Sequence, residues 1–139
     1  MINLSLLRNL IGTPTAWQGQ DHILFFEDID EPLYKIDHML WQMQQAGRFK
    51  GLRGVIVGDF IPHADDQDSS ADPTQPPYGK TLVDLLLQYL PAKIPVCRDF
   101  PCGHSSYLTT LPIGAHVALH VKDQTTHLAL LEAVVQSPV

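Results

Sequence analysis

Two short segments of this sequence carry side chains that could transfer protons in catalysis. In the first, residues 26–28, an apolar run ends in the carboxylates of Glu27 and Asp28. The second is the loop sequence DFPCGHS at residues 99–105, which contains His104. An imidazole, with an ordinary pKa of about 6.5, can take a proton from a nucleophile and return it to a leaving group, and a carboxylate can hold that imidazole in one tautomer. The two segments are therefore candidates for an acid–base pair.

Both segments also have structural interpretations that the pattern leaves open. Glu27 or Asp28 could begin a turn or cap the following helix, and His104 could contact the backbone of its own loop. A rival enzyme would use Cys102 as its own nucleophile, which predicts a thiol that reacts at neutral pH.

The sequence does not predict a metal site. Cys97, Cys102 and His104 match no common zinc spacing, and a fourth ligand is not evident. The acidic loop with Asp66 and Asp68 lacks the Gly and the Glu of a calcium loop. We therefore expect neither a metal ion nor an organic cofactor.

The bulk composition restricts the class of protein. The 139 residues suit one domain, 1–139, and with 45% hydrophobic and 17% charged residues they can bury a core. The formal net charge of -6 argues against nucleic acid as a partner, because phosphate binding needs clustered Lys and Arg. No apolar run approaches the ~20 residues that span a bilayer, and no signal peptide is visible. We interpret Cys97 and Cys102 as reduced thiols of a cytoplasmic protein.

The elements that must position the two candidate segments alternate between strand and helix. Continuous apolar runs predict strands that are buried on both faces. Apolar residues at helical spacing predict two helices, the first capped by Asp30, with Pro32 in its first turn and Gly47 at its end. The predicted order is a helical turn at 3–10, a strand at 23–26, a helix over 33–43, a strand at 54–60, a loop at 61–79, a helix over 82–90, a strand at 94–100, and a hairpin of 115–121 with 127–131.

This order predicts an α/β domain whose mixed sheet is flanked by helices, with a β-rich C-terminal end. Catalytic groups in such domains tend to lie at the C-terminal ends of strands, so Glu27 and His104 are expected on the same edge of the sheet. Residues 64–77, rich in Asp, Ser and Pro, are predicted to be the most mobile internal segment.

Short motifs run along nearly the whole chain in a characteristic order. They are NLS at 3–5, IGTP at 11–14, ILFFED at 23–28, EPLYKID at 31–37, QQAG at 44–47, GVIVGDF at 54–60, FPCGH at 100–104 and LPIG at 111–114. Together they resemble the C-terminal domain of LD-carboxypeptidases, a domain that the microcin C immunity peptidases share.

The resemblance implies a bacterial serine peptidase of two domains that removes the terminal D-Ala from muramoyl tetrapeptides in cell-wall recycling. Its first domain carries the nucleophilic Ser and the oxyanion hole, and its second domain supplies a Glu and a His. In this sequence the Glu falls on Glu27, in FFED, and the His falls on His104, in CGHS. The resemblance also implies a muropeptide substrate. We expect a homodimer, either through the face around Glu27 and His104 that a missing first domain would leave exposed, or through a native surface, since family members tend to dimerise.

The chain departs from the family pattern in two places. No Gly-x-Ser elbow appears, and Ser5 lies before the first strand, where the family has no nucleophile. We therefore expect that the first domain is missing, that Met1 marks a start inside a longer reading frame, and that this chain alone is inactive. His38 stands where the family usually has Arg. The alternative is a non-enzymatic α/β domain that binds a peptide or another protein.

Overall fold

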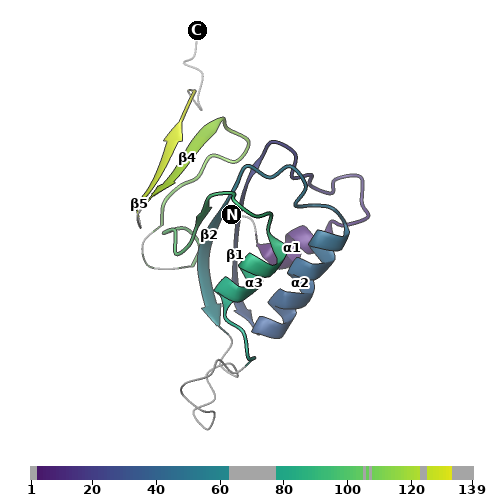
Figure 1. The fold of residues 1–139 in the computed structure, drawn as a ribbon. Coiled ribbons are helices and arrows are strands. Elements are labelled where there is room, and N and C mark those ends of the chain that lie inside the picture. Colours follow the sequence, from purple (N-terminus) through teal and green to yellow (C-terminus); the bar gives the residue numbers. More distant parts are fainter. Residues whose placement is uncertain (1–2, 63–77, 105, 107, 123–124, 133–139) are drawn as a thin grey trace.

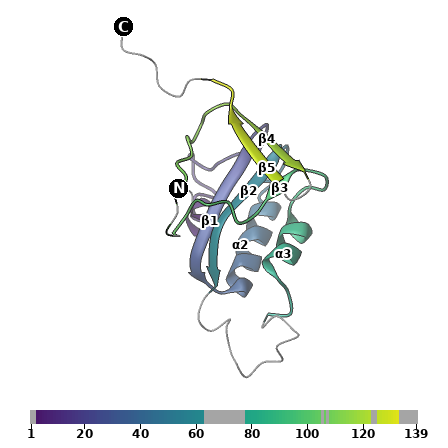
Figure 2. The same ribbon diagram turned by 90° about the vertical axis from the view of Figure 1, so that its left-hand side faces the viewer.

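The computed structural model describes residues 3–62, 78–104, 106, 108–122 and 125–132. Parallel strands β1, β2 and β3 form one sheet in that order, and β4 and β5 form a separate antiparallel hairpin. The three helices cover one face of the parallel sheet, and the hairpin lies on the other (Figure 1, Figure 2). The elements are α1 (Leu4–Asn9), β1 (Ile23–Glu31), α2 (Leu33–Gln45), β2 (Gly54–Pro62), α3 (Leu82–Tyr89), β3 (Val96–Cys97), β4 (Val117–Lys122) and β5 (Thr125–Leu130).

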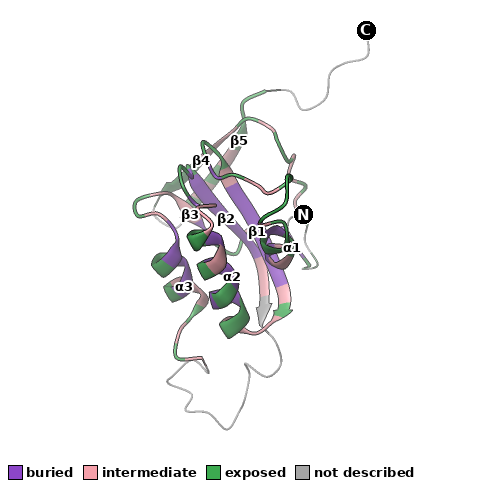
Figure 3. Ribbon diagram, turned by 90° about the vertical axis from the view of Figure 1, so that its right-hand side faces the viewer, coloured by how far each residue is buried: buried purple, intermediate pink, exposed green. Residues whose placement is uncertain are grey.

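β1 and β2 each contribute to two apolar clusters because neighbouring strand residues point to opposite faces. Leu24 and Phe26 of β1 pack in the larger cluster with buried residues of the helices. Phe25 and Ile56 join Cys102 in the smaller cluster, against which the hairpin packs Leu119 and Leu128. Figure 3, seen from the helix side, shows the buried stretches of β1 and β2 behind the helices. Burial on both sides explains why these strands read as continuous apolar runs.

The predicted α/β class is confirmed, with the parallel and antiparallel strands in separate sheets. Some predicted boundaries were wrong. β1 continues to Glu31, and Asp30, with φ of 59°, is a strand residue and not the cap of α2. β3 has only two residues, because the left-handed backbone of Asp99 (φ 54°) turns the chain out of regular pairing soon afterwards. Residues 64–77, predicted to be mobile, lie outside the described residues.

The helix ends follow local chemistry. Gly47, with φ of 69°, lies just beyond α2 and ends it as predicted. α3 begins with a capping box, in which the Thr81 hydroxyl accepts from the Asp84 amide (3.2 Å) and the Asp84 carboxylate accepts from the Thr81 amide (2.7 Å). Within the described part of the chain, no helix is long and apolar enough to cross a membrane.

A buried carboxylate joins the two longer helices. Asp37 of α2 accepts hydrogen bonds from the hydroxyls of Tyr89 and Tyr78 (2.8 Å to Tyr78) and from Lys80 Nζ (3.1 Å). Burial by itself would raise the pKa of Asp37, but the hydrogen bonds from Tyr89, Tyr78 and Lys80 outweigh it and lower this pKa. Burial and the neighbouring Asp37 carboxylate raise the pKa of Tyr89 to about 12.

Candidate active site

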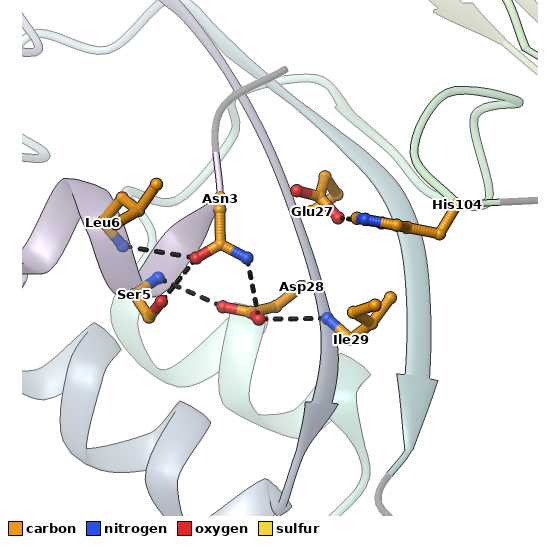
Figure 4. Close-up of polar contacts among 7 residues, drawn as sticks. All are labelled: Asn3, Ser5, Leu6, Glu27, Asp28, Ile29 and His104. Atoms are coloured by element: carbon orange, nitrogen blue, oxygen red, sulfur yellow. Dashed lines mark hydrogen bonds and ion pairs between the residues drawn. The ribbon is translucent and has the colours of Figure 1, made fainter.

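Glu27 and His104 meet directly, although 77 residues separate them in the sequence (Figure 4). His104 Nδ1 lies 3.0 Å from Glu27 Oε2. Glu27 is completely buried, whereas the His104 side chain is 38% exposed. With Glu27 ionised, Nδ1–H donates to Oε2, and Nε2 keeps the lone pair that a general base needs.

The other carboxylate oxygen of Glu27 differs from Oε2. Oε1 is buried, and among the described residues no donor lies within hydrogen-bonding distance of it. A buried acceptor without a donor is costly, and in native structures such groups often belong to functional sites.

A bulge in the parallel sheet lies opposite Glu27. Phe26 pairs with Val57 and Asp28 pairs with Phe60, so that two residues of β2, Gly58 and Asp59, face Glu27 alone. Bulges of this kind re-aim side chains and are common beside active sites.

The loop that carries His104 docks on this bulge. The Phe100 amide donates to the Val57 carbonyl, and the Asp59 amide donates to the Cys102 carbonyl, both at 3.1 Å. A Cβ atom at Gly58 would lie 2.2 Å from that Cys102 carbonyl oxygen, closer than atoms can approach. Gly58 is therefore needed for the loop to reach β2. Because β2 pairs with β1, this contact places His104 beside Glu27.

Asp28 points to the opposite face and is also buried. Its Oδ1 accepts from Asn3 Nδ2 and from its neighbour's amide, that of Ile29, both at 3.0 Å. Its Oδ2 accepts from the Ser5 amide at 3.1 Å. Asn3 in turn caps α1, since its Oδ1 accepts from the Leu6 amide at 3.3 Å (Figure 4).

Cys102 does not have the surroundings of a nucleophile. It is 8% exposed, and burial raises the pKa of its thiol. The nearby Asp59 and Glu27 carboxylates act in the same direction, because they disfavour a thiolate. Cys97 and Cys102 are both free and buried. These surroundings oppose the rival reading in which Cys102 reacts at neutral pH.

A separate hollow of about 700 Å³ opens on the hairpin side of the sheet, near the start of β1. Its lining is largely apolar and includes Phe25, Ile56, Ile113 and Leu131. Glu27 and His104 are not among its lining residues, so the acid–base pair lies outside this hollow.

The sequence pattern indicated that Glu27 and His104 would lie close together, but not which residues position them. Asn3, Gly58 and Asp59 had no assigned role, and Asp28 was considered only as the start of a turn or a helix cap. The one signal available was Gly58, because a glycine inside a buried strand pattern marks a bulge or a close backbone approach.

The comparison with known proteins covers nearly the same span as the motifs. Residues 3–119 match the family model of the LD-carboxypeptidase C-terminal domain. This chain belongs to that family. The LD-carboxypeptidase resemblance predicted from the motifs is therefore confirmed.

Relatives of this family domain are longer than the chain. A probable murein peptide carboxypeptidase of Bacillus subtilis is 35% identical over 132 residues, which make up 94% of this chain and 38% of that protein. The murein tetrapeptide carboxypeptidase of Pseudomonas aeruginosa is 24% identical over 119 residues, or 84% of this chain and 36% of that protein. The chain thus spans somewhat more than a third of these relatives.

Solved structures agree with the LD-carboxypeptidase fold. Muramoyltetrapeptide carboxypeptidase from Oxalobacter formigenes superposes with a TM-score of 0.68 at 31% identity, covering 91% of this chain and 42% of that one. An MccF-like protein from Bacillus anthracis has a TM-score of 0.70 at 24% identity, covering 94% and 38%, and supports the fold alone.

Proposed function

We propose that this chain supplies the Glu and the His of a Ser-Glu-His triad in a serine-type LD-carboxypeptidase. The observation that carries the proposal is the 3.0 Å contact between His104 Nδ1 and the buried Glu27 carboxylate. A first domain outside this chain would contribute the nucleophilic Ser and the oxyanion hole. The substrate would be a muropeptide, as the names of the relatives indicate.

In the proposed reaction, His104 Nε2 takes the proton of the serine hydroxyl as its oxygen attacks the carbonyl before the terminal D-Ala. Glu27 stabilises the imidazolium that forms, and it does so strongly because it is buried away from water. His104 then gives the proton to the amine of the departing D-Ala. In the second half, His104 takes a proton from water, which attacks the acyl-enzyme, and returns it to the serine.

The exposure of the two side chains supports this division of roles. Glu27 needs to contact only His104, and it is fully buried. His104 must meet a serine and a substrate that come from outside this chain, and its side chain is partly exposed. The chain alone would be inactive, because a general base without nucleophile and oxyanion hole has little to act on.

The test is release of D-Ala from a muramoyl tetrapeptide. This chain alone is expected to release none, whereas a fusion of the first domain of the Bacillus subtilis relative to this chain is expected to be active. An exposed histidine of the hairpin provides the control, since His120→Ala should leave the fusion unchanged. Robust turnover by the chain alone would refute the two-domain mechanism, and an inactive folded fusion would favour a peptide- or protein-binding domain.

A further inference from the structure

We infer that Asp28 is a positioning residue for the Glu27–His104 pair: its hydrogen bond to Asn3 helps to hold the backbone of Glu27 in place. The inference rests on the proposed acid–base role of that pair and adds to it a residue from the opposite face of β1. Asp28 contacts neither the imidazole nor any group that would react, so its effect must pass through the backbone of Glu27.

The backbone of Glu27 is weakly constrained on the side of β2. The regular pairing of the two strands is interrupted there, because Gly58 and Asp59 form the bulge opposite Glu27. A residue beside a bulge has lost part of the ladder that normally fixes its orientation. Another contact must therefore hold Glu27 in place.

That contact comes from the other edge of β1. Asn3 forms an isolated parallel bridge with Glu27. The Asn3 side chain donates to Asp28 Oδ1 at 3.0 Å, and the Ser5 amide donates to Asp28 Oδ2 at 3.1 Å. Both oxygens of Asp28 thus fasten Asn3 and the first turn of α1 to the strand, at the residue next to Glu27.

The alternation of the strand couples the two carboxylates. Because neighbouring residues point to opposite faces, a twist of β1 that moved Glu27 away from His104 would also pull Asp28 away from its donors. Asp28 is only 3% exposed, so breaking these bonds would leave a buried carboxylate unpaired. The contacts of Asp28 therefore resist the motion that would separate Glu27 from His104.

The tautomer of His104 distinguishes positioning from a general contribution to stability. A carboxylate that merely stabilises the fold would change the free energy of unfolding and leave the folded site as it was. A positioning residue changes how often Glu27 accepts from Nδ1–H in the folded chain. NMR chemical shifts of the two ring nitrogens report that directly, at a pH where the imidazole is neutral.

The experiment compares three variants of the 139-residue chain. Glu27→Ala removes the acceptor and gives the reference for an imidazole that is not held. Asp28→Asn keeps the shape but turns an amide donor toward N–H groups, and it is expected to move the tautomer populations most of the way to that reference. Asp30→Asn is the matched control, an exposed carboxylate on the same strand whose left-handed backbone suits Asn, and it should retain the wild-type tautomer.

Each outcome decides between the two proposals. A folded Asp28→Asn chain with the wild-type tautomer overturns the positioning role while leaving the triad proposal intact. If Glu27→Ala itself leaves the tautomer unchanged, the pair is not coupled in solution, and the triad proposal fails with it. If Asp28→Asn does not fold, Asn3→Ala is tested in its place. That variant removes only the Asn3 donor, and Asp28 keeps its hydrogen bonds to the Ser5 and Ile29 amides. A shifted tautomer supports the inference, and a wild-type tautomer overturns it.

Discussion

Glu27 and Asp37 are both buried carboxylates, but their surroundings differ. Asp37, on the helix side, receives donors from Tyr89, Tyr78 and Lys80. Among the described residues, the Glu27 carboxylate, on the hairpin side, forms a hydrogen bond only with the half-exposed imidazole of His104, and its Oε1 has no donor. A carboxylate surrounded by fixed donors holds elements together. A carboxylate that contacts the imidazole of a general base is placed to stabilise the imidazolium that forms during a reaction.

The largest difference between Glu27 and Asp37 should appear in catalytic activity. In the two-domain fusion, His104→Ala and Glu27→Gln are each expected to lower kcat by roughly 10⁴-fold, because the base or its correct tautomer is lost. Asp37→Asn, in a fusion that remains folded, should leave kcat close to the wild-type value. Steady-state kinetics of D-Ala release measures all three. A fall in kcat for Asp37→Asn that matches the other two would break the comparison.

For the free energy of unfolding, the order should be reversed, with Asp37 more important than Glu27. Asp37→Ala leaves the buried Tyr89 hydroxyl and Lys80 without their shared acceptor and is expected to cost about 2–4 kcal/mol of unfolding free energy. Glu27→Gln should change that free energy by no more than about 1 kcal/mol, since Glu27 is incompletely satisfied. Urea denaturation of the 139-residue chain measures both. Equal losses of unfolding free energy would mean that Glu27 stabilises the fold as much as Asp37 does.

The docking of the His104 loop can be disturbed without removing any catalytic group. Gly58→Ala places a Cβ atom against the Cys102 carbonyl and must push the loop away from β2. The fusion is expected to lose roughly 10²-fold in kcat/KM, the loss that a displacement of about 1 Å can cause.

Gly79→Ala is the control for the Gly58→Ala experiment. It meets no atom within 4 Å, but its φ of 71° is strained for Ala, so it should lower stability slightly and leave kcat/KM unchanged. Equal kcat/KM for the Gly58→Ala and wild-type fusions would show that the loop does not need this approach to β2.

Acid should weaken the Asp37 cluster in a defined window. The folded-state pKa of Asp37 is lowered, so its contribution is fully present above the ordinary carboxyl pKa of about 3.9 and is lost as pH falls through the lower folded-state value. The stability difference between wild type and Asp37→Asn should therefore be constant near neutral pH and shrink below about pH 4. Urea denaturation at a series of pH values measures it. A difference that persists undiminished into strong acid would contradict this assignment.

The smallest effect expected is weak self-association through the hairpin side. Leu108, Ile113 and Leu131 are 64%, 59% and 66% exposed, and Ile113 and Leu131 line the apolar hollow. We expect a homodimer at micromolar concentration, measurable by size-exclusion chromatography with light scattering. Ile113→Asp should weaken it, and Tyr34→Asp on the helix side should not. A strict monomer at that concentration would refute this expectation.

The sequence indicated Glu27 and His104 because both follow apolar runs, and strands of one parallel sheet end at a common edge. The structure differs in one respect: β1 continues beyond Glu27, which therefore lies within the strand and not at its end. Gly58 was a signal for a bulge or a close approach, but the sequence could not place the bulge opposite Glu27, because the register of two strands depends on which residues pair across the sheet. The role of Asp28 was hidden for a related reason. Its partner Asn3 lies 25 residues away, and nothing in either local sequence indicates their hydrogen bond.

Boundary errors had local causes. Asp30 had the residue type of a helix cap and stood just before Pro32, yet its left-handed backbone belongs to the end of β1. The predicted strand at 94–100 kept its apolar character, but regular pairing stopped after Cys97. In both places an element was predicted in the right part of the chain, but its end was placed at the wrong residue.

The distance along the chain between Glu27 and His104 also sets an order of assembly. The β1–α2–β2 unit is complete within residues 23–62, whereas His104 follows much later. In a nascent chain leaving the ribosome, this unit can pack before the His104 loop has been synthesised, because contacts close in sequence form with less loss of chain entropy. Until then Phe25 and Ile56 lack Cys102 and the hairpin as cover. The unfinished polypeptide therefore exposes an apolar sheet face, and it gains its acid–base pair only when that face closes.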